Sequence, residues 1–232
     1  MSQKYSTDST GEAQFCGQVV AGSTNVSGKP FIAHDSSGNV IACGVLSSPP
    51  ASQIFEAEIA PFGLSFVSGT MTVYNPGKGT VFMYGNAVDL QPNLLSYMMG
   101  GMDCNATLGC GVHIHAGTSC ATEALQGDHW YNSTALTMDP WLKVGYEQTN
   151  SKGDAQFCAA VTIDEASVAG HAAVIHSNNG TRVACGILEG GNSTSPSPGS
   201  NGTSKTSSSR PIYWAHVTMG SLLVTISAAC MF

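Results

Sequence analysis

The chain has 232 residues, a formal charge of −7 at pH 7 and only 8 lysines and arginines. It offers no basic patch, which argues against nucleic-acid binding. Charged residues make up 10% of the chain, against about 25% in typical soluble domains. Ser, Thr, Gly and Asn take their place, and such a surface is typical of glycosylated or wall-embedded proteins.

The predicted elements begin, in chain order, with part of an internal repeat. Residues 11–48 align without a gap with residues 153–190 at an offset of 142, and 14 of the 38 positions are identical. We interpret residues 1–50 as the C-terminal fragment of a first module whose front half is absent, which would also account for the missing secretory signal peptide. Residues 54–190 then form a complete second module. The matched pairs include Cys16 with Cys158, His34 with His176 and Cys43 with Cys185.

Short β-strands are predicted throughout the complete module. Runs of β-branched and aromatic residues alternate with Gly, Pro and Asn turns, and the segment 75–79 reads as a hairpin loop. Many short strands separated by frequent turns indicate an all-β sandwich or barrel. The predicted strands include residues 71–74, 80–84, 112–115, 155–162, 172–176 and 182–188.

The C-terminal part of the chain divides into two low-complexity segments. Residues 191–210 read as a Ser/Thr/Gly/Pro linker, and residues 211–232 as an apolar tail. Small residues, a polar spacer and a terminal hydrophobic tail form the pattern of a GPI attachment signal. A tail-anchored transmembrane helix and a buried terminal strand are the alternatives. The GPI interpretation predicts an extracellular protein at the cell surface or cell wall, which contacts the membrane through its lipid anchor.

Cysteines and glycosylation signals point to the same compartment. The chain has eight cysteines, and no two of them have the C-x-x-C spacing of a zinc ribbon or a thioredoxin-type motif. Dispersed cysteines suit disulfides in an oxidising compartment, the alternative being a set of buried free thiols. Six N-x-[ST] sequons occur, at Asn25, Asn105, Asn132, Asn179, Asn192 and Asn201.

Four histidines of the complete module form a candidate metal site. His113 and His115 are two positions apart on a predicted strand, so both rings face one side and can meet one metal; two surface histidines are the alternative. His129 follows in a glycine-flanked loop, and His176 ends an apolar strand. Four imidazoles without a nearby thiolate motif suit copper, although imidazole also suits zinc.

The order of the motifs resembles that of the copper/zinc superoxide dismutase family. The resemblance covers residues 54–190 in full and residues 11–48 in part, and it implies a Greek-key β-sandwich or barrel that acts on superoxide. The motifs that carry it are Gly111–His115, Cys120, Gly127–Asn132, His176 and Gly180–Gly186.

The resemblance also implies residue roles. His129 matches the family's histidine between copper and zinc, so it is expected to alternate between a copper-bound and a protonated form. Arg182 matches the active-site arginine that holds the anion, and Cys120 with Cys185 matches the disulfide within the module. The implied copper ligands are His113, His115, His129 and His176.

Two departures from the family pattern imply a copper-only member. Residues 130–152 contain no histidine, and Asp139 is their only aspartate, so a zinc site of about four ligands cannot be built there. Only residues 177–179 separate His176 from the next motif, where the family has a long electrostatic loop. We therefore expect copper and no zinc, with Asp139 or Glu147 orienting His129 in place of zinc.

The sequence thus predicts an extracellular copper-only superoxide dismutase. A non-catalytic copper-binding or structural cell-surface module is the alternative function. The oligomeric state stays open, as does the disulfide pairing of Cys16, Cys43, Cys104, Cys110 and Cys158.

Overall fold

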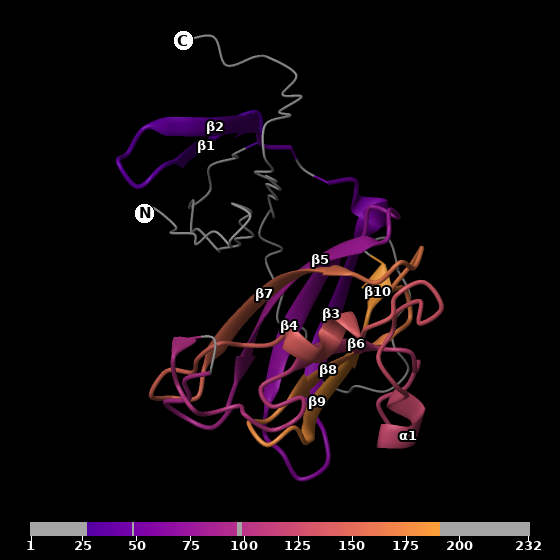
Figure 1. Ribbon diagram of the computed structural model, residues 1–232. Coiled ribbons are helices and arrows are strands. Elements are labelled where there is room, and N and C mark those ends of the chain that lie inside the picture. Colours follow the sequence, from indigo (N-terminus) through magenta and orange to yellow (C-terminus); the bar gives the residue numbers. More distant parts are fainter. Residues whose placement is uncertain (1–26, 48, 97–98, 191–232) are drawn as a thin grey trace, which may run out of the picture. The chain divides into compact units, whose positions relative to one another are not determined.

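The computed structural model describes residues 27–47, 49–96 and 99–190 (Figure 1). These residues fall into two compact units that divide after Pro49, and each unit is described by itself. The predicted linker and apolar tail lie outside the described residues, so the predicted domain boundaries stay predictions. In the ranges that the structure describes, no helix has the length and apolar character needed to cross a membrane.

The second unit is built on one antiparallel sheet of eight strands that curls into a nearly closed barrel. Seven strands follow the order β6-β8-β9-β3-β4-β5-β7, and β10 pairs with β3. The predicted all-β fold class is confirmed by this strand pairing. The strands are β3 (Ile54–Pro61), β4 (Ser68–Tyr74), β5 (Thr80–Val88), β6 (Val112–His115), β7 (Ala155–Thr162), β8 (Ala172–His176), β9 (Arg182–Ile187) and β10 (Glu189–Gly190).

The helices whose bounds the structure gives in this unit are single turns. They are η1 (Ala51–Gln53), α1 (Glu123–Gln126) and η3 (Pro140–Lys143). The last two lie in the long connection between β6 and β7, which also carries one of the four candidate histidines. This connection therefore builds the surroundings of the candidate site rather than the barrel wall.

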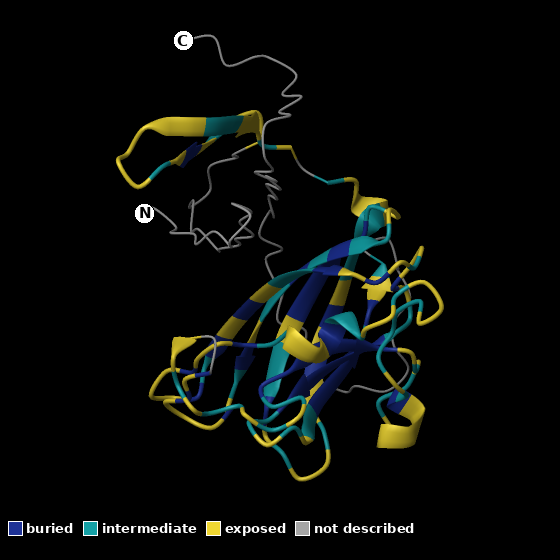
Figure 2. Cartoon of the chain, viewed as in Figure 1, coloured by how far each residue is buried: buried dark blue, intermediate teal, exposed yellow. Residues whose placement is uncertain are grey.

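The hydrophobic core fills the inside of the barrel, where the strands are buried in Figure 2. Side chains alternate between the two faces of a strand, and in β6 the inward positions are Val112 and Ile114, both fully buried in the core cluster. His113 and His115 consequently face the outer side of the sheet. They are nevertheless buried, because the β6–β7 connection folds over that side.

The first unit contains a hairpin of β1 (Pro30–His34) and β2 (Val40–Val45). Its register reproduces that of β8 and β9 with a shift of 142 residues: Pro30 pairs with Val45 as Ala172 pairs with Ile187. Each hairpin has a register irregularity immediately before its histidine. The sequence repeat is therefore also a structural repeat over these two hairpins, and the assignment of residues 1–50 to a partial first module stays a prediction.

Candidate metal centre

Four histidines of the second unit converge at one point outside the barrel wall. One ring nitrogen from each of His113, His115, His129 and His176 lies within 4.8 Å of those of the other three. Among the described residues they form the one group of three or more potential ligands with this spacing. His129 is the most accessible, with 8% of its side chain exposed, whereas the other three residues are at most 1% exposed.

Strand pairing brings three of the rings together. His113 and His115 share one face of β6, and β8 pairs with β6 in antiparallel register. The ladder continues past the start of β6, because the His176 N–H donates to the Gly111 carbonyl at 2.8 Å. The irregularity between Ile175 and His176 thus sits at the residue whose ring has to reach the cluster.

The fourth ring is delivered by the connection that follows β6. The chain turns back after α1 and runs antiparallel to the end of β6, with a bridge between His115 and His129. The Trp130 N–H donates to the Ile114 carbonyl at 2.8 Å, and the Ala116 N–H donates to the Asp128 carbonyl at 2.7 Å. These bonds place His129 beside His115, with ring centroids 4.9 Å apart.

In each ring, one nitrogen contacts an oxygen atom of a backbone carbonyl or a carboxylate, and this contact orients the ring. A carbonyl or carboxylate oxygen can only accept, so the nitrogen facing it carries the proton and the remaining nitrogen has the lone pair. His113 Nδ1, His115 Nε2 and His176 Nε2 are buried with no hydrogen-bond partner among the described residues. The contacts are His113 Nε2 to Val144 O at 3.1 Å, His115 Nδ1 to Gly127 O at 2.8 Å, His176 Nδ1 to Gly180 O at 2.8 Å and His129 Nδ1 to Asp139 Oδ2 at 2.6 Å.

Burial keeps three of these imidazoles neutral. It lowers the pKa of His113 to about 2, that of His115 to about 3 and that of His176 to about 4. Repulsion from neighbouring histidines and, for His115 and His176, from the Arg182 guanidinium acts in the same direction. Neutral imidazoles with buried, unpartnered lone pairs are costly without a cation and are suitable ligands for copper or zinc.

Arg182 lies at the edge of the cluster, opposite His176 in the β8–β9 pair. Its Nη1 donates to the Glu123 carbonyl at 2.9 Å and to Gln126 Oε1 at 3.1 Å. Its Nη2 donates at 2.9 Å to the Gly127 carbonyl, which also contacts His115 Nδ1. These three bonds use three of the five guanidinium N–H groups and leave two without a partner among the described residues.

Disulfides fix the segments around the cluster. Cys120 and Cys185 form one disulfide, which joins the start of the β6–β7 connection to β9 and so to Arg182. Cys104 and Cys110 form another, a pairing that the sequence left open. In the sequence, the only indication of this pairing was that the two cysteines are six residues apart in a turn-rich loop.

The structure brings Asp139 rather than the exposed Glu147 to His129.

Comparisons with known proteins give structural likenesses alone. No family model and no curated protein sequence matches the chain. Among solved structures, Candida albicans superoxide dismutase 5 with Cu(II) is 18% identical, with 67% of this chain and 99% of that chain covered and a TM-score of 0.40. A mutant of the same enzyme is also 18% identical, with 60% and 89% covered and a TM-score of 0.40. The clock protein EA4 is 15% identical, with 61% and 96% covered and a TM-score of 0.42.

Proposed function

We propose that this chain is a copper-only superoxide dismutase in which His113, His115, His129 and His176 hold the metal. The observation that carries the proposal is the convergence of four ring nitrogens within 4.8 Å, three of them buried and without a hydrogen-bond partner in the described part of the chain. An all-imidazole donor set suits a copper ion. When bound, copper supplies a one-electron cycle between Cu(II) and Cu(I), through which two superoxide ions and two protons give oxygen and hydrogen peroxide.

Arg182 is the group that attracts and orients the anion. The chain carries a net charge of −7, so attraction of superoxide must be local rather than general. The guanidinium offers a planar fork of N–H donors, and its positive charge acts on the rings of His115 and His176. Its three hydrogen bonds to the β6–β7 connection hold it in place beside the cluster while leaving N–H groups for an anion.

His129 is the candidate proton carrier. Its side chain is the most exposed of the four, at 8%, which gives it the best access to protons from solvent. Its Nδ1 is occupied by Asp139 at 2.6 Å, so only Nε2 remains to bind the metal or a proton. Asp139 fixes the orientation of the ring in either state, which is the usual role of a carboxylate behind a ligand histidine.

The cellular location of the protein is inferred from features outside the histidine cluster. Disulfides are typical of secreted proteins, and the four cysteines of the two disulfides described above lie in the same unit as the cluster. Together with the six sequons and the GPI-like tail, they support an extracellular protein anchored to the cell surface. The absence of a zinc site stays a prediction, based on the lack of histidines in residues 130–152.

Metal analysis and a superoxide assay on the full chain test the proposal. We expect one copper ion per chain, no zinc, and rapid superoxide removal that is lost on treatment with a copper chelator. Copper binding without turnover would instead support the alternative, a non-catalytic copper-binding module. Failure to bind copper at all would overturn both.

A further inference from the structure

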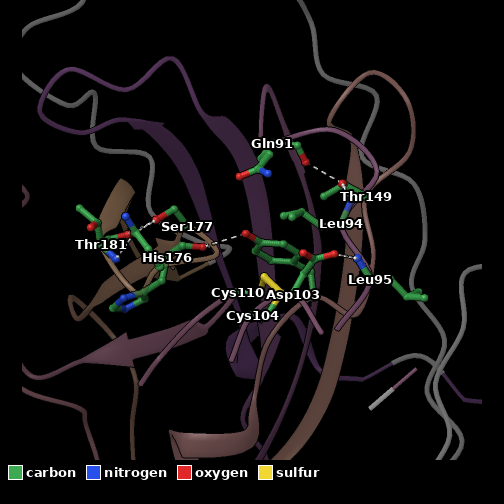
Figure 3. Close-up of a disulfide and its surroundings, with 12 residues drawn as sticks. Gln91, Leu94, Leu95, Asp103, Cys104, Cys110, Thr149, His176, Ser177 and Thr181 are labelled. Atoms are coloured by element: carbon green, nitrogen blue, oxygen red, sulfur yellow. Dashed lines mark hydrogen bonds between the residues drawn. A yellow bond between two sulfur atoms is a disulfide. The ribbon is translucent and has the colours of Figure 1, made fainter. Parts of the chain in front are cut away.

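We propose that the Cys104–Cys110 disulfide and the Tyr146 hydroxyl act together as a positioning element that holds His176 in the metal centre. The inference rests on the proposed function only in taking His176 as a copper ligand. Figure 3 shows this disulfide close to His176 and Ser177. Neither cysteine nor the tyrosine contributes an atom to the cluster, so their effect is exerted through the backbone.

The disulfide loop is joined directly to the backbone around His176. The Cys110 N–H donates to the Ser177 carbonyl at 2.8 Å, and the adjacent Gly111 carbonyl accepts from the His176 N–H at 2.8 Å. Cys110 and Gly111 thus extend the β6–β8 ladder by two residues beyond Val112. This extension reaches the end of β8, where the register irregularity precedes His176.

Tyr146 also connects the disulfide loop to the backbone of His176. Its backbone N–H donates to the Cys110 carbonyl at 3.0 Å, and its hydroxyl donates to the His176 carbonyl at 3.0 Å. The residue is only 2% exposed, and burial raises the pKa of its hydroxyl, so it remains a neutral donor. Both backbone polar groups of His176 are therefore held, one by the disulfide loop and one by Tyr146.

The conformation of the loop explains why a covalent link is needed. Cys104, Leu108 and Cys110 have φ between 60° and 63°, and they are three of the six non-glycine residues with positive φ in the described chain. This left-handed region is unfavourable for L-residues and persists where the surroundings enforce it. The disulfide closes the loop within six residues and removes alternative conformations of the chain that would release Cys110 from Ser177.

Close packing transmits the position of the loop to the β8–β9 turn. A Cβ on Gly180 would lie 2.3 Å from the Thr107 carbonyl oxygen, and one on Gly109 would lie 2.6 Å from the Asn178 carbonyl oxygen. The Gly180 carbonyl is also the partner of His176 Nδ1. The loop therefore supports both the backbone of His176 and the acceptor that orients its ring.

Three variants test the inference: Cys104→Ser with Cys110→Ser, Tyr146→Phe, and all three substitutions combined. For Tyr146→Phe we expect Cu(II) binding weaker by about fivefold, the effect of one net hydrogen bond. Loss of the disulfide should weaken binding by about 10- to 100-fold, with altered Cu(II) EPR parameters. The combined variant should lose less than the product of the two factors, since both act on His176.

The matched control is Tyr84→Phe. Tyr84 also has a hydroxyl hydrogen bond, to Thr72, but it lies in β5, which pairs with β4 and β7 only. The copper affinity and EPR parameters of the Tyr84→Phe variant should equal those of the parent. Equal affinity and EPR parameters in the disulfide and Tyr146 variants would overturn the inference, while leaving the proposed function intact.

Hydrogen exchange in the metal-free chain gives a second readout that needs no copper. Loss of the disulfide should speed exchange of the His176 and Cys110 amides at least tenfold and leave amides of the β5–β7 pair unchanged. Unchanged exchange at His176 and Cys110 would also overturn the inference, and this outcome does not depend on whether the chain binds copper.

Discussion

His129 Nδ1 lies 2.6 Å from Asp139 Oδ2, and the other oxygen of this carboxylate accepts a hydrogen bond from the Trp141 N–H at 2.9 Å. The start of η3 thus fixes the carboxylate that contacts the imidazole. Because this contact decides which nitrogen of His129 keeps a lone pair, it should affect metal binding without providing a ligand.

Asp139→Asn is expected to weaken Cu(II) binding by about 10- to 100-fold, the usual cost of losing the partner behind a ligand histidine. The asparagine keeps an oxygen for Trp141, but its amide group cannot accept from His129 in the same way. A competition titration with a chelator of known affinity measures the change. Glu147→Gln is the control, since it removes the same charge from an exposed position of the same β6–β7 connection; an equal loss there would contradict a specific role for Asp139.

Arg182→Ala is expected to lower the rate of superoxide removal several-fold while copper remains bound. The parent rate should fall as salt is added, because screening weakens the attraction of an anion, and the variant should show a flatter salt dependence. Lys78→Ala changes the net charge equally but lies in the β4–β5 hairpin, at the other end of β3 from the β9 contact. Stopped-flow rates of the two variants at low salt that match each other would refute the role of Arg182.

The metal-free chain should lose stability in mild acid. The folded pKa values of His113, His115 and His176 are about 4 or lower, so as the pH falls below about 6.5 the unfolded chain takes up protons first. Each of the three then reduces the free energy of unfolding by about 1.4 kcal/mol per pH unit. The full contribution is present above about pH 6.5.

Urea unfolding of the metal-free chain between pH 7.5 and pH 5 measures this effect. His176→Gln should make the pH dependence shallower, because it removes one of the three buried imidazoles. A free energy of unfolding that stays constant down to pH 5 would rule out neutral, buried imidazoles in the folded state.

Gly111→Ala is expected to displace the ring of His113. An added Cβ would lie 2.3 Å from His113 Cε1 and 2.5 Å from His113 Nε2, distances that require the ring to move. We expect at least a tenfold loss of Cu(II) affinity, measured by the same competition titration. Gly44→Ala serves as the control, because its Cβ would have no atom within 4 Å; a variant at Gly111 that binds like the parent would show that the ring has another stable position.

The sequence was informative wherever a short-range pattern determines the structure. The strands β6, β7 and β8 have the predicted bounds, because their runs of β-branched and small apolar residues end at clear turns. The placement of His113 and His115 on one face follows from the two-residue period of a strand alone. The residue pattern likewise predicted a strand over residues 182–188, close to the observed β9 (Arg182–Ile187).

Other features depend on contacts that no local pattern encodes. β3 was not predicted, since Glu56 and Glu58 alternate with only two fully buried apolar side chains, Ala57 and Ile59. The carbonyl groups that orient the histidine rings belong to loops, and every residue has a carbonyl, so residue type gives no signal. The choice between Asp139 and Glu147 needed the path of the chain through η3.

The β1–β2 hairpin shows that the backbone geometry before a histidine can be copied with a short piece of sequence. Among the described residues, the same irregularity precedes His34 in the β1–β2 hairpin and His176 in the β8–β9 hairpin. The irregularity therefore recurs together with the hairpin sequence. Duplication of such a fragment during evolution would copy a ready-bent histidine into a new setting, where the remaining ligands could be acquired one at a time.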